Sequence, residues 1–315
     1  MTDTDGILLV NKPPRLTSHD VVERIRKLLK TKKVGHFGTL DPLARGLLLV
    51  AVGKATRLFP FYSKLDKTYR GQIRLGFATD TFDTEGQPTS PGTKTYPEKR
   101  SLELFMNTFL GEIDQIPPPY SAKKHKGKPL YTYARQNRRV EKPPVKVAVH
   151  SFQLLDYKPP RIDVRIHCSS GTYIRSLAHD LGQAIGCGAH LAGLERTAIG
   201  SFSIDKSHHL EDLESLIQDN TSATFLIPLE DLLPELNKII LKESGKILAQ
   251  NGNMIYADNI QKIILSKEPP PYSDAADQIF RLFSPDGRLV AYAKKDSTKN
   301  GMHPFLVIDT EDSDE

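Results

Sequence analysis

Residues 35–46 read Gly-His-Phe-Gly-Thr-Leu-Asp-Pro-Leu-Ala-Arg-Gly, and this is the most informative stretch of the chain. It has no apolar periodicity, but it combines three glycines and a proline with several functional side chains. Such a composition predicts an ordered loop over residues 31–46, the kind of segment that carries function on a rigid scaffold. Asp41 is its candidate catalytic carboxylate, although an Asp-Pro pair is equally typical of an acid that caps a backbone turn.

The segments on either side predict elements that hold this loop. Gly6–Val10 is an apolar run stopped by two prolines, as expected for a buried strand. Ser18 is a suitable N-cap for an amphipathic helix that runs to Lys30. After the loop comes the apolar run Leu47–Val52, and a helix is expected near residues 55–63.

Further along, the pattern alternates strands with a few helices, which predicts an α+β fold with a mixed, largely antiparallel sheet. Strands are expected at 67–77, 145–157, 161–168 and 194–202, and helices at 101–110, 177–185 and 210–217. The turn at 169–175 presents Tyr173 and Arg175 between a strand and a helix, where site residues are common. Ser284-Pro285-Asp286-Gly287 is a hairpin signal between two further short strands.

Length and composition indicate a globular protein of two domains. The chain has 315 residues, of which 38% are hydrophobic and 26% charged. The pattern is lost between Gln218 and Pro228, and we place a domain boundary near residue 227. Residues 1–227 would form the larger domain and residues 228–315 a compact β-rich module with an acidic tail.

The charge favours a polyanion as partner. The formal net charge is +5, and it rises to +9 without the four acids in Glu311–Glu315. Residues 116–144 interleave lysines and arginines with tyrosines, which can grip phosphates and stack on bases. The alternative for this insertion is an ordinary solvated loop.

Cysteine content and hydropathy limit the other classes. Cys168 and Cys187 lack the spacing of a disulfide framework or of a zinc site, so a reducing, cytoplasmic compartment is expected. Apolar runs such as Leu47–Val52 are too short to span a bilayer, and we expect neither a signal peptide nor a membrane anchor.

The loop and five other segments resemble the TruB family of pseudouridine synthases, in the same order along residues 6–230. Gly6–Pro14 is similar to the opening segment of the family and Lys67-Thr68-Tyr69 to its tyrosine strand. The remaining similar segments are Pro118–Ala122, Cys168–Leu177 and Leu194–Gly200.

The resemblance implies a pseudouridine synthase fold with a PUA-like C-terminal domain that binds RNA. It also implies an enzyme that makes pseudouridine 55 in the T arm of transfer RNA without any cofactor or metal. Asp41 would then be the catalytic carboxylate, acting on the base or on the ribose. Arg175 would pair with it in a desolvated pocket, whereas the alternative for Arg175 alone is a helix-surface ion pair.

The resemblance assigns roles to four more residues. Tyr69 would pack on the uracil and is a candidate for removing the proton at carbon 5, although a strand tyrosine is equally typical of a core. Tyr173 would support the base or the arginine. His36 would help to occupy the position vacated when the uridine is extruded from its loop. Arg57 stands where a lysine is frequent and would contact RNA; Thr68 replaces an arginine and loses one possible phosphate contact.

Two other functions are alternatives to this one. A non-catalytic RNA-binding or RNA-folding module would use the same basic surface, and substitution of Asp41 by Asn separates the two. A metal-dependent nuclease or deaminase is disfavoured because the His, Cys and acidic residues do not reach ligand spacing. We expect a monomer that binds transfer RNA and no membrane.

Overall fold

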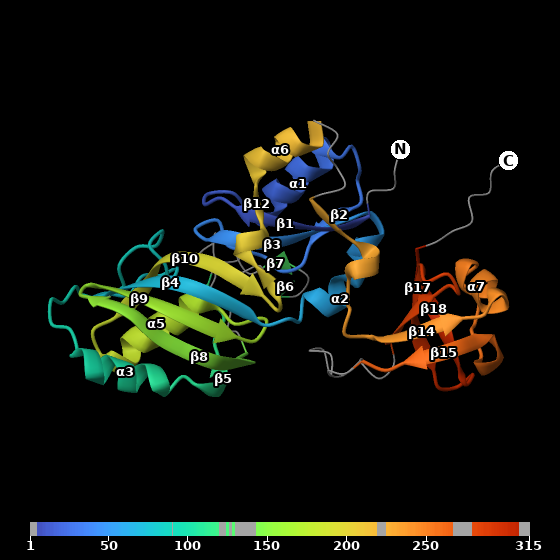
Figure 1. The fold of residues 1–315 in the computed structure, drawn as a ribbon. Coiled ribbons are helices and arrows are strands. Elements are labelled where there is room, and N and C mark those ends of the chain that lie inside the picture. The colour runs from blue at the N-terminus through green and yellow to red at the C-terminus, as the bar shows by residue number, and fades with distance from the viewer. Residues whose placement is uncertain are drawn as a thin grey trace.

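The computed structural model describes residues 5–89, 91–119, 124–125, 128–129, 143–218, 225–266 and 279–308. Figure 1 shows two sheets with helices packed on their faces, which confirms the predicted α+β class. The helices are α1 (Ser18–Leu28), α2 (Phe59–Tyr62), α3 (Lys99–Asn107), α5 (Ile174–Ile185), α6 (Leu210–Gln218) and α7 (Glu243–Gln250). The predicted basic insertion at 116–144 lies largely outside the described residues, within which it contributes the short pair β6 (Lys124–His125) and β7 (Lys128–Pro129).

The larger sheet has the strand order β12-β1-β3-β10-β4-β9-β8-β5, with β2, β11 and β13 paired at its margins. Its strands are β1 (Gly6–Lys12), β2 (Val34–His36), β3 (Arg45–Val52), β4 (Lys67–Leu75), β5 (Gly111–Gln115), β8 (Val145–Lys158), β9 (Arg161–Cys168), β10 (Ala189–Ile199), β11 (Phe202–Ser203), β12 (His208–His209) and β13 (Leu226–Pro228). Among its described pairs, β1 with β12 and β3 with β10 are parallel, so the sheet is mixed and largely antiparallel, as predicted.

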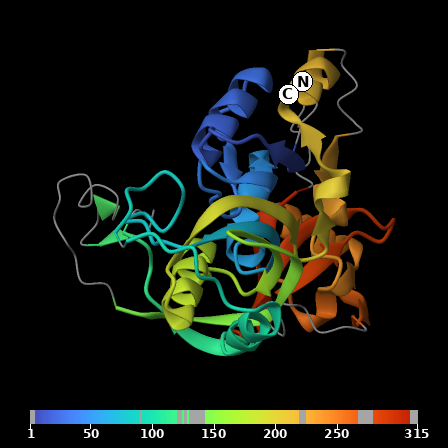
Figure 2. The same cartoon turned by 90° about the vertical axis from the view of Figure 1, so that its left-hand side faces the viewer.

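Helix α5 covers one face of the β10-β4-β9-β8 half, and these strands curve around it in Figure 2. The sequence explains the contact, because alternate residues of β4 are buried from Lys67 to Leu75 while those between them face outward. Helix α5 presents Leu177, Ala178 and Leu181 to the same core. Gly186 ends this helix in the left-handed conformation with φ of +84°, which glycine adopts without strain.

Helices α1 and α6 lie side by side over the β1-β3 half (Figure 1). The N-cap of α1 is Thr17, which forms a capping box with Asp20, so the prediction of Ser18 as N-cap was wrong. The helix also ends at Leu28, before the predicted Lys30. The hydroxyl of Ser18 instead accepts a hydrogen bond from the amide of Leu40 at 2.8 Å and donates one to its carbonyl at 3.1 Å. Helix α1 thereby holds the loop that carries Asp41.

The loop predicted for residues 31–46 contains the short strand β2, and its last two residues already belong to β3. Val34–His36 form β2, which pairs with β3 from Val34 opposite Val52 to His36 opposite Val50. After β3, the chain forms the 3-10 turn η1 (Gly53–Leu58) and α2 in place of one continuous helix at 55–63.

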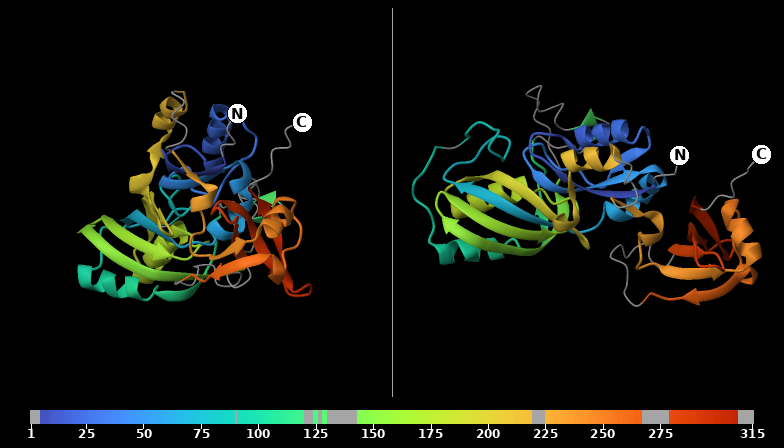
Figure 3. Two further views of the ribbon diagram at one scale, coloured as in Figure 1. Left: turned by 45° about the vertical axis from the view of Figure 1, so that its right-hand side comes forward. Right: turned by 45° about the horizontal axis from the view of Figure 1, so that its top comes forward.

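The second sheet has the order β15-β14-β16-β17-β18 and lies at one end of the molecule in both views of Figure 3. Its strands are β14 (Asn237–Leu241), β15 (Ile260–Ile264), β16 (Ile279–Phe283), β17 (Leu289–Asp296) and β18 (Gly301–Val307). The predicted hairpin turn joins β16 to β17, with the amide of Ser284 donating to the carbonyl of Arg288 at 2.9 Å. The chain leaves the first sheet at β13 and enters the second at β14, and the division at residue 227 stays a prediction.

One apolar core joins the two sheets. Phe61 and Tyr62 of α2 pack in the same cluster as Tyr292 of β17 and Leu306 of β18. In the described part of the chain, no helix combines the length and the hydropathy that crossing a membrane requires.

Candidate active site

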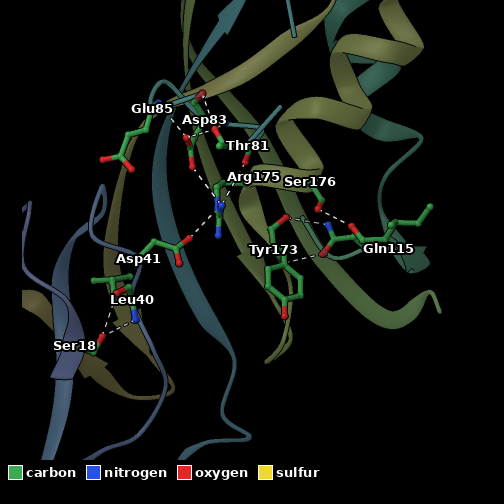
Figure 4. A network of polar contacts seen from close by, with 11 residues as sticks. Ser18, Leu40, Asp41, Thr81, Asp83, Glu85, Gln115, Tyr173, Arg175 and Ser176 are labelled. Carbon is green, nitrogen blue, oxygen red and sulfur yellow. Dashed lines mark hydrogen bonds and ion pairs between the residues drawn. The ribbon is translucent and has the colours of Figure 1, made fainter. Parts of the chain in front are cut away.

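Asp41 and Arg175 form an ion pair across the first sheet. Asp41 lies in the loop between β2 and β3, and Arg175 is the second residue of α5. Nε of Arg175 is 2.9 Å from Oδ2 of Asp41, and Figure 4 shows the two side chains pointing toward each other. The arginine side chain is only 7% exposed, whereas the aspartate side chain is 42% exposed. The carboxylate is therefore held from inside the protein and open to a ligand from outside.

This geometry differs from both simpler interpretations of the pair. In the turn after Asp41, it is the backbone carbonyl of Asp41 that accepts a hydrogen bond from the amide of Ala44, at 3.0 Å. The carboxylate faces Arg175 instead. Arg175 is buried and does not form a helix-surface ion pair.

A second carboxylate, which the sequence did not reveal, holds the other end of the guanidinium. Oδ2 of Asp83 is 3.3 Å from Nη1 of Arg175, and the carbonyl of Thr81 accepts from the same nitrogen at 3.4 Å. Oδ1 of Asp83 accepts from the hydroxyl of Thr81 at 2.5 Å and from the amide of Glu85 at 3.1 Å (Figure 4). Arg175 therefore bridges a buried acid and an exposed one.

A cavity of about 290 Å³ opens beside the ion pair. Asp41, Tyr69, Tyr173 and Arg175 all line it, so the structure brings these four predicted residues together. Burial raises the pKa of the Tyr69 phenol, and the charge of Arg196 and a hydrogen bond with it oppose the rise. The phenol is therefore neutral at physiological pH and offers a ring face and a hydroxyl.

Tyr173 is fixed through its backbone. Its amide donates to Oε1 of Gln115 at 2.7 Å, and its carbonyl accepts from Nε2 of the same residue at 3.0 Å (Figure 4). Gln115 is the last residue of β5, and its side chain is almost fully buried while it binds both backbone groups of Tyr173. This contact sets the direction in which α5 starts.

A larger cavity of about 810 Å³ shares Asp41 and Arg175 with the smaller one. His36 lines the larger cavity, and burial together with the charge of Arg196 lowers the pKa of its imidazole. Within the described residues, the buried Nδ1 of His36 has no hydrogen-bond partner. Arg57 lies exposed in η1 and lines neither of the two cavities.

Three buried cations surround the floor of the site. Arg196 donates to the carbonyls of Leu47 at 2.8 Å, Gly38 at 3.1 Å and Thr39 at 3.3 Å, and so ties the loop to β10. Lys12 and Lys67 also donate to backbone carbonyls. Burial lowers the pKa of each lysine to about 8.

Arg196 is a site residue that the sequence did not reveal, although it lies in the segment Leu194–Gly200. The available signal was a charged residue two positions after Leu194, on a strand that is otherwise mostly apolar or small. A charged side chain is rarely buried in a strand unless hydrogen bonds satisfy it. Arg196 meets this condition because it donates to three carbonyls.

Chemically, the arrangement presents one carboxylate to a cavity whose walls carry a tyrosine ring and positive charge. A carboxylate in this position can attack an electrophilic carbon or stabilise a cationic sugar. The positive surroundings favour a ligand that carries or develops negative charge.

The chain is similar to known proteins along most of its length. The N-terminal domain of TruB family pseudouridylate synthase matches residues 26–174, and the tRNA pseudouridylate synthase B C-terminal domain matches residues 175–240. The chain is 45% identical over 304 residues to tRNA pseudouridine synthase B of Solibacter usitatus, which covers 96% of this chain and 100% of that protein. It is also 45% identical over 258 residues to the protein of the same name from Dehalococcoides mccartyi, covering 82% and 86% of the two chains.

Solved structures show the same fold. A structure of an H/ACA RNP bound to a substrate RNA containing 2′-deoxyuridine has a chain that matches with a TM-score of 0.70 and 25% identity, covering 98% of this chain and 87% of that one. A Cbf5-Nop10-Gar1 complex matches with a TM-score of 0.67 and 28% identity, covering 97% and 84%.

Proposed function

Because the chain belongs to the TruB family of pseudouridylate synthases, we propose that it isomerises uridine to pseudouridine in transfer RNA, at position 55 of the T loop. The observation that carries the proposal is the ion pair of Asp41 and Arg175 in the wall shared by the two cavities. This pair supplies a fixed carboxylate at a place that a nucleotide can reach.

The reaction rearranges bonds within one nucleotide. The bond from C1′ of the ribose to N1 of uracil breaks, the base turns, and a bond from C1′ to C5 forms. C5 loses a proton and N1 gains one, so no oxidant, reductant or energy source is consumed. Asp41 acts on the base or on the ribose, and Arg175 orients the carboxylate throughout.

Tyr69 and Tyr173 would enclose the base in the smaller cavity. The ring of Tyr69 supplies a stacking surface, and its hydroxyl lies next to Arg196. Since burial keeps this phenol protonated, accepting the proton from C5 requires that Arg196 stabilise the phenolate while it forms.

The target uridine has to leave its loop to enter this cavity. His36, with Nδ1 free of described partners, would lie against the RNA in the larger cavity. Arg57, exposed on η1, would contact the phosphate backbone farther out. The second sheet would act as a PUA-like RNA-binding domain, and the enzyme would work as a monomer in the cytoplasm.

The proposal is tested on unmodified transfer RNA made by transcription. The purified protein is incubated with it, and isomerised uridines are mapped by carbodiimide labelling and reverse transcription. We expect one new stop, at the T-loop uridine. A stop elsewhere would change the assigned specificity, and no stop at all would contradict the enzyme assignment.

Asp41→Asn separates the enzyme from a non-catalytic RNA-binding module. We expect the variant to lose pseudouridine formation by at least about 10³-fold, because the amide cannot act as a nucleophile or carry the charge. The dissociation constant for transfer RNA should stay within about threefold. Asp212→Asn, at an exposed position of α6, is the matched control and should behave like the unmodified protein.

A further inference from the structure

The loop between β4 and α3 contains a backbone conformation that its sequence does not favour. Phe82, between Thr81 and Asp83, has φ of +65°. This left-handed region is energetically costly for a residue with a bulky side chain, and glycine is the residue that usually occupies it. A strained residue between two groups that bind Arg175 calls for a local contact that keeps it in place.

The contact is a ring stack with α5. The ring of Phe82 lies 3.8 Å from the imidazole of His179, centroid to centroid, at an interplanar angle of 15°. His179 follows Arg175 by four residues, so both side chains project from the same side of α5, one turn apart. The helix therefore contacts the tripeptide Thr81-Phe82-Asp83 at two points. Arg175 forms an ion pair with Asp83, and His179 stacks on Phe82.

The chemistry of His179 suits a stacking role. Within the described residues its buried Nδ1 has no hydrogen-bond partner, so the imidazole is not held there by a polar network. Burial also lowers the pKa of this side chain, which leaves it uncharged near the guanidinium at physiological pH. On the far side of the tripeptide, the carbonyl of Phe82 accepts from the amide of Leu191 at 3.0 Å. The loop is thus pinned between β10 and α5.

We propose that the Phe82–His179 stack is a positioning device for Arg175. It fixes the carbonyl of Thr81 and the carboxylate of Asp83 on Nη1, so that Nε of Arg175 stays directed at Asp41. Neither ring touches the reacting nucleotide in this scheme, and both act through Asp83 and the guanidinium. The inference rests on the proposed function, because its main readout is pseudouridine formation.

The test uses the full-length protein and a single-turnover assay on unmodified transfer RNA. His179→Ala should lower the rate about tenfold, with the dissociation constant for RNA unchanged, since a small misplacement of a catalytic group costs rate before binding. His179→Phe keeps a ring in the stack and should recover the rate to within about threefold of the unmodified protein. An equal loss in both variants would show that an imidazole nitrogen matters instead, and would overturn the proposal.

Phe82→Gly distinguishes positioning from simple stability. Glycine adopts φ of +65° freely, so the variant should keep its melting temperature, yet it lacks the ring and should lose rate as His179→Ala does. Full activity of Phe82→Gly would contradict the proposal. This variant also keeps the test decisive if His179→Ala does not fold.

A double-mutant cycle with Asp83→Asn identifies the route. If the stack acts through Asp83, adding His179→Ala to Asp83→Asn should change the rate less than about twofold, whereas independent roles would multiply. A readout without activity is the ¹⁵Nε signal of Arg175, which should move in His179→Ala and stay in His179→Phe. Absence of pseudouridine with the unmodified protein would refute the proposed function, while an unmoved Arg175 signal would refute the positioning role.

Discussion

Lys67 is a buried ionisable residue at the floor of the site. Its side chain donates to the carbonyls of Ser63 and Leu65, and it is almost inaccessible to solvent. Burial lowers its pKa from 10.5 to about 8, which means that the folded protein releases this proton more easily than the unfolded chain. The lysine therefore makes stability depend on pH.

The sign of this dependence can be tested with Lys67→Met. Between pH 8 and 10.5 the unfolded chain binds more protons at this position, so raising the pH favours the folded unmodified protein relative to the variant. From pH 7 to pH 9.5, the difference in free energy of unfolding should move by about 2 kcal/mol in favour of lysine. Urea unfolding of both proteins at the two pH values measures it, and parallel pH dependences would refute the prediction.

Single residues of the site were predictable to different degrees. Asp41 and Arg175 lie in segments whose composition already stood out, and the ion pair between them follows from the resemblance. Asp83 sits in a loop rich in Thr, Asp and Gly, where acids commonly make turns. Its role depends on packing against a residue 92 positions away, which no local pattern records.

Among the elements, β3 and β10 approach each other closely at Gly46. Gly46 lies opposite Arg196 in this parallel pair and has φ of +106°. A Cβ at Gly46 would come 2.4 Å from the carbonyl oxygen of Arg196 and 2.8 Å from its amide nitrogen. Only glycine allows the two strands to approach so closely.

Gly46→Ala should therefore separate these strands. We expect the free energy of unfolding to fall by roughly 2–4 kcal/mol, from the strained φ together with the backbone clash. The rate of pseudouridine formation should fall as well, because Arg196 also binds the carbonyls of Gly38 and Thr39 in the loop of Asp41. Gly92→Ala is the control, since a Cβ there meets nothing within 4 Å. Equal stability of the two variants would count against this account.

Most elements were predictable, and their ends were not. The alternation of apolar residues predicted β4 and β9, and their helical spacing predicted α1 and α5. Thr17 and Ser18 are both suitable N-cap residues. Thr17 takes this position because the hydroxyl of Ser18 binds the backbone of Leu40, a contact that the local sequence does not show. The strand β2 was missed because its three residues are stabilised by pairing with β3 and have no pattern of their own.

At the scale of the whole molecule, the two sheets share a core. The hydroxyl of Tyr292 lies 2.9 Å from the carbonyl of Leu229 and 2.8 Å from that of Leu232, in the segment that links the sheets. The hydroxyl of Tyr62 in turn accepts from the amide of Leu233 at 3.1 Å. Tyr292 of β17 and Tyr62 of α2 therefore both hold the segment that links the two sheets.

We expect the chain to unfold in one cooperative transition as a result. Tyr292→Phe should lower the free energy of unfolding by about 1–3 kcal/mol, because it removes the buried hydroxyl donor that the carbonyls of Leu229 and Leu232 share. Far-ultraviolet circular dichroism and tyrosine fluorescence should shift together in urea. Two separate transitions, with only one of them moved by the substitution, would show that the sheets unfold independently.

The hairpin of the second sheet was predictable from Ser284–Gly287, but the shared core was not. Residues such as Phe61, Tyr292 and Phe305 read as ordinary apolar residues of separate segments. Their contact brings together parts of the chain more than 200 residues apart, with the rings of Phe61 and Phe305 centred 6.1 Å from each other.

The pairing of β1 has a consequence for synthesis on the ribosome. One edge of β1 pairs with β3, which is translated soon afterwards, but its other edge pairs with β12 and β13. Leu8 meets Leu226, and Val10 meets His208. The nascent chain must therefore carry an open apolar strand edge through most of its elongation, and such edges recruit other strands. Slow translation would prolong that exposure and give the strand more time to pair wrongly.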